Sequence, residues 1–178
     1  MRWIRRRARD EAPADAKWNW RLAETRRLDG TPRLDELASE LDAVRATELR
    51  RRDVELRTRW NPTERRGGFR VRAEDVPRLV REARAPSLTA ALLSTHTDGH
   101  VREAATEVLA TIADPDVGYP FLLIRCADWV ENVRELAVVA VTRASATVSE
   151  RTLLECAVLF ERLSEPGSRG WNDAARIR

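Results

Sequence analysis

The stretch that decides the fold reads LLSTHTDGHVREAA over residues 92–105, and it returns as LLIRCADWVENVRELA over residues 122–137. Each copy has a double leucine, a short polar loop with an aspartate, and then the tripeptide Val-Arg-Glu. The tripeptide starts at Val101 and again at Val133, so the pattern repeats after 32 residues. A period of this length is typical of proteins built from stacked pairs of helices.

Apolar residues at three- and four-residue spacing predict helices on both sides of each loop. We expect first helices over residues 87–95 and from 121 onward, second helices over 101–112 and 130–143, and a further helix over 150–163. The second helices carry small residues such as Ala105 and Ala137, which let neighbouring helices approach closely. Asp114-Pro115 and Gly118 are predicted to break the chain between the copies, so that Pro120 starts the next helix.

Aspartate before the second helix, followed by Val-Arg-x-x-Ala, resembles the HEAT-like repeat family, and residues 128–134 look like a version common in uncharacterised bacterial HEAT-repeat proteins. The resemblance covers residues 76–163 at most. It implies an all-α fold, a short right-handed α-solenoid of helical hairpins with a helical N-terminal extension. In this family the loop aspartate and the arginine of successive repeats often form a ladder, which implies such roles for Asp98, Arg102, Asp128 and Arg134.

The N-terminal part differs in charge from the repeats. Residues 1–72 hold 20 basic and 13 acidic residues, and residues 73–178 hold 12 and 16. We therefore divide the chain into a basic, mostly helical region at 1–72 and a HEAT-like repeat domain at 73–178. A helix is predicted from Thr31-Pro32 to about Arg59, stopped by Asn61-Pro62, because a residue before proline is disfavoured in the α conformation.

The two ends of the chain fall outside the repeat pattern. Residues 1–30 hold Trp3, Trp18 and Trp20, which we expect to dock a partly helical arm. Gly67-Gly68 lies at the centre of the predicted linker over residues 61–73. Residues 171–178 look like the start of another helix, which is expected of a longer array or of an end that packs on a partner, because a terminal repeat otherwise exposes its apolar face.

Composition excludes several classes of function. Cys126 and Cys156 lie in apolar helical stretches and form no CxxC pair, and with only His96 and His100 beside them we expect buried thiols and neither a metal nor a cofactor. No window of about 18 apolar residues exists, so no membrane span is predicted and the expected location is cytoplasmic. No nucleophile elbow or phosphate-binding glycine loop is present.

Two candidate sites have alternative interpretations. Arg102 and Arg134 could face a ligand, but we favour the ladder with Asp98 and Asp128. Trp129 could be an exposed anchor of the kind found in binding hot spots, but we favour packing at the first turn of its helix. The arginines at 50–52, 57 and 59 could contact phosphate, yet the acidic residues among them favour a solvated charged face.

These observations predict a non-enzymatic protein–protein interaction module whose stacked helices present a long surface to another protein. Two alternatives stay open. One is a nucleic-acid-binding protein related in fold to HEAT-like DNA glycosylases, although the repeat half is net acidic. The other is an enzyme similar to the HEAT-repeat bilin lyases.

Overall fold

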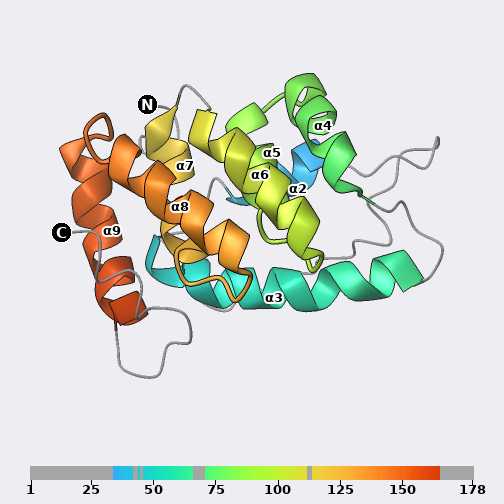
Figure 1. Cartoon of the computed structure of the whole chain (residues 1–178), viewed down its shortest axis with the longest axis horizontal. Helices are drawn as coiled ribbons and strands as arrows, with labels where there is room; N and C mark the ends of the chain where they lie inside the picture. Colours follow the sequence, from blue (N-terminus) through green and yellow to red (C-terminus); the bar gives the residue numbers. More distant parts are fainter. Residues whose placement is uncertain (1–33, 42–43, 45, 66–70, 112–113, 165–178) are drawn as a thin grey trace.

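The computed structural model describes residues 34–41, 44, 46–65, 71–111 and 114–164, and this part of the chain is helical without strands (Figure 1). In chain order the helices are α2 (Leu34–Leu41), α3 (Ala46–Arg65), the short 3₁₀ helix η2 (Ala73–Asp75), α4 (Val76–Glu82), α5 (Pro86–Leu93), α6 (Gly99–Thr111), α7 (Pro115–Arg125), α8 (Glu131–Ala144) and α9 (Glu150–Ser164). The predicted all-α class is confirmed. The expectations for residues 1–30, for Gly67-Gly68 and for residues 171–178 lie outside the described residues.

The two copies of the repeated stretch form two helical hairpins that pack against each other. Helix α5 contacts α6 and α7 contacts α8, while α6 lies against α8 and α5 against α7. The small residues Ala105 and Ala137 are both fully buried in this packing. Both Val-Arg-Glu tripeptides therefore lie in helices that touch, as the recurrence of the tripeptide predicts.

Helix α7 begins earlier than predicted. It starts at Pro115 and runs through Gly118 and Pro120, so the expected break before residue 121 is wrong. The side chain of Asp114 accepts a hydrogen bond from the amide of Asp116 and caps the helix, and Pro115 occupies the first position, where no amide hydrogen bond is lost. The proline in the second turn costs only the bond that its amide would have made.

The single helix predicted from residue 31 to 59 is two helices in the structure. Helix α2 ends at Leu41, and Val44 is buried in the connection, with its amide bonded to the carbonyl of Leu41. Helix α3 then continues through Asn61-Pro62 to Arg65, so the predicted stop at residue 61 is also wrong. Proline only disfavours the helical conformation of the residue before it, and here the last turn forms in spite of it.

Helix α3 runs across the N-terminal ends of α6 and α8 (Figure 1). Its contacts are with α7 and α9, and α2 packs on α5. Leu41 of α2 and Leu49 of α3 belong to the same hydrophobic core as Leu92 and Leu123 of the hairpins. Helices on both sides of the predicted boundary between residues 72 and 73 thus share one core.

Candidate functional site

A buried carboxylate organises the turn between α7 and α8. Asp128 is 1% exposed, and its two oxygens accept hydrogen bonds from Nε and Nη2 of Arg102, both at 2.9 Å. Arg57 of α3 donates from Nη2 at 3.0 Å, and Arg125 donates from Nη1 at 3.3 Å. Three guanidinium groups from three helices therefore converge on one side chain.

A second carboxylate ties α3 to the same cluster. Asp53 bonds Nη2 of Arg125, and its other oxygen lies 3.1 Å from Nε of Arg57. Arg125 also donates to the carbonyl oxygen of Ser94 in the preceding hairpin at 2.7 Å. We name these five ionic residues the turn cluster: Asp53, Arg57, Arg102, Arg125 and Asp128. It joins α3 to both hairpins.

The turn cluster holds three positive and two negative charges in a nearly dry environment. The side chains of Arg102, Arg125 and Asp128 are at most 1% exposed, and Arg57 is the most open at 12%. Burial lowers the pKa of Arg125 despite the charge of Asp53. Burial alone would raise the pKa of Asp128, but the hydrogen bond from Arg102 and the charge of Arg125 outweigh it and lower that pKa. Asp128 is therefore held ionised.

Trp129 is the exposed face of this cluster. The favoured expectation, packing at the first turn of a helix, is wrong, because α8 begins at Glu131 and Trp129 is 66% exposed. The guanidinium carbons of Arg57 and Arg102 each lie 4.4 Å from the centroid of its ring, within the range of cation–π contacts. An exposed aromatic ring is thus fixed by two arginines that buried carboxylates hold in turn.

Of the residues implied in the ladder, the structure joins Arg102 and Asp128, which belong to successive hairpins. Asp98 instead accepts a hydrogen bond at 2.9 Å from the amide two residues later. Arg134 donates at 3.1 Å to the backbone oxygen of Asp128. Arg102 repeats that contact in its own hairpin, where its Nη1 donates to the backbone oxygen of His96.

The two hairpins are related by 32 residues and not by the 30 that separate Asp98 from Asp128. Helices α5 and α7 end at Leu93 and Arg125, and α6 and α8 start 32 residues apart as well. His96 therefore occupies the place of Asp128 in the first hairpin. It is fully buried, and its Nδ1 accepts the amide of Asp98 at 3.0 Å. The pairing of Asp98 with Asp128 used the wrong register.

Sequence reasoning missed three members of the turn cluster. Asp53 and Arg57 were placed in a solvated charged face, which is wrong for both, since they are 7% exposed and half-buried respectively. Arg125 was not singled out. The signal for the first two was their spacing of four residues, which puts opposite charges on one side of a helix. No local signal shows that this side faces the turn of α7 and α8.

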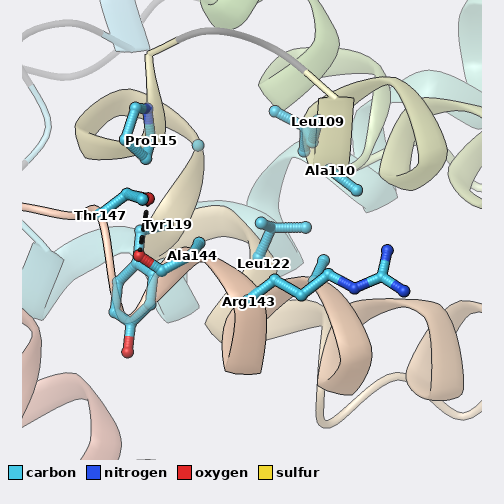
Figure 2. Close-up of a pocket in the computed structure, with 10 residues that line it drawn as sticks. Leu109, Ala110, Pro115, Tyr119, Leu122, Arg143, Ala144 and Thr147 are labelled. Carbon is cyan, nitrogen blue, oxygen red and sulfur yellow. Dashed lines mark hydrogen bonds between the residues drawn. The ribbon is translucent and has the colours of Figure 1, made fainter.

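A separate pocket of about 470 Å³ lies at the far end of the hairpins from α3 (Figure 2). It is lined by Leu109, Ala110, Pro115, Gly118, Tyr119, Leu122, Ala140, Arg143, Ala144 and Thr147. The guanidinium group of Arg143 points away from Tyr119, so the two polar groups do not converge (Figure 2). Burial and the neighbouring thiols raise the pKa of Tyr119.

Both cysteines are buried, as predicted, and burial raises the pKa of each thiol to about 12. Within residues 34–41, 44, 46–65, 71–111 and 114–164, no three His, Cys, Asp or Glu side chains are grouped to hold a metal ion. In the same residues no helix is long and apolar enough to cross a membrane. Comparison of the chain with protein-family models, with curated proteins and with solved structures finds no match.

Proposed function

We propose that the chain is a HEAT-like, right-handed α-solenoid that works in the cytoplasm as a non-enzymatic protein-binding module. Its contact surface is centred on Trp129. We name this the Trp129 surface and define it as Trp129, Arg57 and the exposed Val54 of α3. The stacked hairpins and α3 supply a rigid frame for a surface of this kind.

The observation that supports the proposal is the exposed ring of Trp129 above a buried ionic cluster. Interface hot spots are enriched in tryptophan and arginine, and preorganised side chains lose little freedom when a partner binds. Here two guanidinium groups lie over the ring, and Asp128 fixes both through hydrogen bonds of 2.9 to 3.0 Å. The indole is therefore held in place before any partner arrives.

A photo-cross-linking amino acid at position 129 tests this proposal in the cells that express the chain. The matched control carries the same group at the exposed Thr142 of α8. We expect a covalent adduct of one defined mass from position 129 and none of that mass from position 142. Trp129→Ala should weaken capture of the adducted protein by at least about tenfold, the size of a hot-spot loss. Equal adducts from both positions would reject the surface.

A further inference from the structure

We infer that the Trp129 surface recognises an acidic segment of the partner protein, through a carboxylate bound at Arg57 beside an apolar side chain packed on Trp129. This inference rests on the proposed function and names the chemistry of its partner. It combines the excess charge of the turn cluster, the one guanidinium group that reaches solvent, and the apolar side chains around it.

The turn cluster is one anion short of neutrality. Three arginines face two aspartates, and all five side chains are at least 88% buried. An unbalanced charge in such a place is costly because water cannot solvate it fully. The Nε of Arg125 is buried without a hydrogen-bond partner in the described part of the chain, which shows how incompletely the cations are satisfied. A carboxylate from outside would balance the charge.

Arg57 is the group that such a carboxylate can reach. Its side chain is 12% exposed, against 0% for Arg102 and 1% for Arg125. Nε and Nη2 face Asp53 and Asp128, and no hydrogen bond joins Nη1 to any residue that the structure describes. Arginine binds carboxylates through hydrogen bonds strengthened by both charges. Nη1 of Arg57 is therefore the donor open to a partner.

The neighbourhood of Arg57 is apolar on two sides. The ring of Trp129 lies 4.4 Å from its guanidinium carbon, and Val54, one helical turn earlier on α3, is 58% exposed. A partner that brings an aromatic or aliphatic side chain next to its carboxylate would cover both. A free inorganic anion would leave them exposed.

The surrounding charges favour a short acidic segment over a nucleic acid. A phosphate backbone needs a row of available cations. On α3, Arg51 and Arg52 already lie 3.9 Å and 2.7 Å from Glu55, and beside Trp129 the side chain of Arg134 lies 3.9 Å from Glu131. One open guanidinium group suits one carboxylate.

Titration of the full chain with sodium phenylacetate, followed by NMR of the tryptophan indole groups, tests the inference. The Trp129 signal is assigned as the one that Trp129→Phe removes. We expect phenylacetate to shift this signal with saturation, whereas the neutral phenylacetamide shifts it at least about tenfold less strongly, because the charge-assisted bond is lost. Added salt should weaken the shift.

Variants then locate the anion site. Arg57→Met leaves two arginines with two aspartates, so the protein should stay folded while phenylacetate affinity falls at least about tenfold. Its control is Arg51→Met on the same helix, whose side chain is 63% exposed. Val54→Lys should strengthen and Val54→Asp should weaken the binding, and both change a solvent-facing position, so they test the site even if Arg57→Met fails to fold.

The outcomes separate the two proposals. If phenylacetate and phenylacetamide act alike, or if Val54→Lys and Val54→Asp change nothing, the acidic partner is rejected. If position 129 still gives its defined cross-link, the proposed function stands with a partner of other chemistry. Tighter binding of a thymidine oligonucleotide than of a peptide of glutamate and phenylalanine would also overturn the inference, in favour of nucleic acid.

Discussion

At the scale of single residues, Asp128 has the largest effect on the fold that the structure predicts. Asp128→Asn would leave Arg57, Arg102 and Arg125 with Asp53 as their one carboxylate. Removing one partner from a buried ionic network costs about 3–5 kcal/mol, because the remaining charges stay buried and unbalanced. We expect a loss of this size in the free energy of unfolding, measured with urea at neutral pH.

The matched control for this substitution is Glu82→Gln. Glu82 forms an ion pair with Arg78 at 3.3 Å, but the two side chains are 62% and 50% exposed. Exposed ion pairs contribute at most about 1 kcal/mol. If both substitutions cost the same, the turn cluster has no special weight in the fold.

The pH dependence of the same variant has a definite sign. The pKa of Asp128 is lowered in the folded chain, so its contribution to stability is present above the unfolded value of about 3.9 and is lost as the pH falls through the folded pKa. The difference in stability between the wild type and Asp128→Asn should therefore shrink below about pH 4. A difference that stays constant into acid would contradict this assignment.

The two thiols give a prediction at alkaline pH. Burial raises the pKa of Cys126 and Cys156 to about 12, so little thiolate forms near pH 8. Alkylation by iodoacetamide should be at least about a hundredfold slower in the folded chain than in urea. Since the folded pKa is raised, stability falls as the pH rises from about 9 towards 12, and alanine at both positions should remove that part of the fall. Equal alkylation rates in the folded and unfolded chains would show that the thiols are open.

The same scale shows what sequence reasoning can find and what it cannot. Trp129 and Asp128 were found because they lie inside the repeated stretch. Arg125 and Asp53 were not, since they are 72 positions apart and meet only through the packing of α3 against the turn. The register of the loops also escaped, because two aspartates 30 residues apart imitate a repeat whose helices are related by 32.

At the scale of helices, the two glycines at the ends of the α6–α7 connection differ in the space around them. A Cβ atom at Gly118 in α7 would lie 3.7 Å from Leu109, an ordinary contact, whereas one at Gly99 in α6 would lie 3.1 Å from Cγ2 of Val130. Gly118→Ala should raise the free energy of unfolding by about 0.5–1 kcal/mol, because alanine favours the helix. Gly99→Ala should give no such gain, since Val130 would have to move. Thermal unfolding of the pair checks the contrast, and an equal gain at both positions would contradict it.

Helix boundaries were predicted best where the apolar pattern and the end signals agree. The final helix was expected at residues 150–163 and is observed at Glu150–Ser164. Proline misled the reasoning twice, at Pro62 and Pro120, because a helix tolerates the loss of one amide bond when packing holds it in place. In α7 that packing is clear, since all residues from Val117 to Arg125 are buried.

At the scale of the whole molecule, the shared core predicts one cooperative unit across the boundary proposed at residues 72 and 73. Leu49 of α3 is 1% exposed in the core that the hairpins form, while Val54 on the same helix is 58% exposed. Leu49→Ala should lower the free energy of unfolding by about 2–5 kcal/mol, and Val54→Ala by less than about 0.5 kcal/mol.

The cooperative unit is tested by following two probes of the Leu49→Ala variant together. Circular dichroism reports all helices, and alkylation of Cys126 and Cys156 reports the repeat half alone. If the chain unfolds as one unit, a cavity in α3 shifts both transitions to the same lower urea concentration. If α3 belonged to a domain of its own, the thiols would stay protected at the wild-type midpoint while part of the helical signal is lost. Coincident transitions would therefore show that α3, which carries Arg57, is a permanent part of the surface around Trp129.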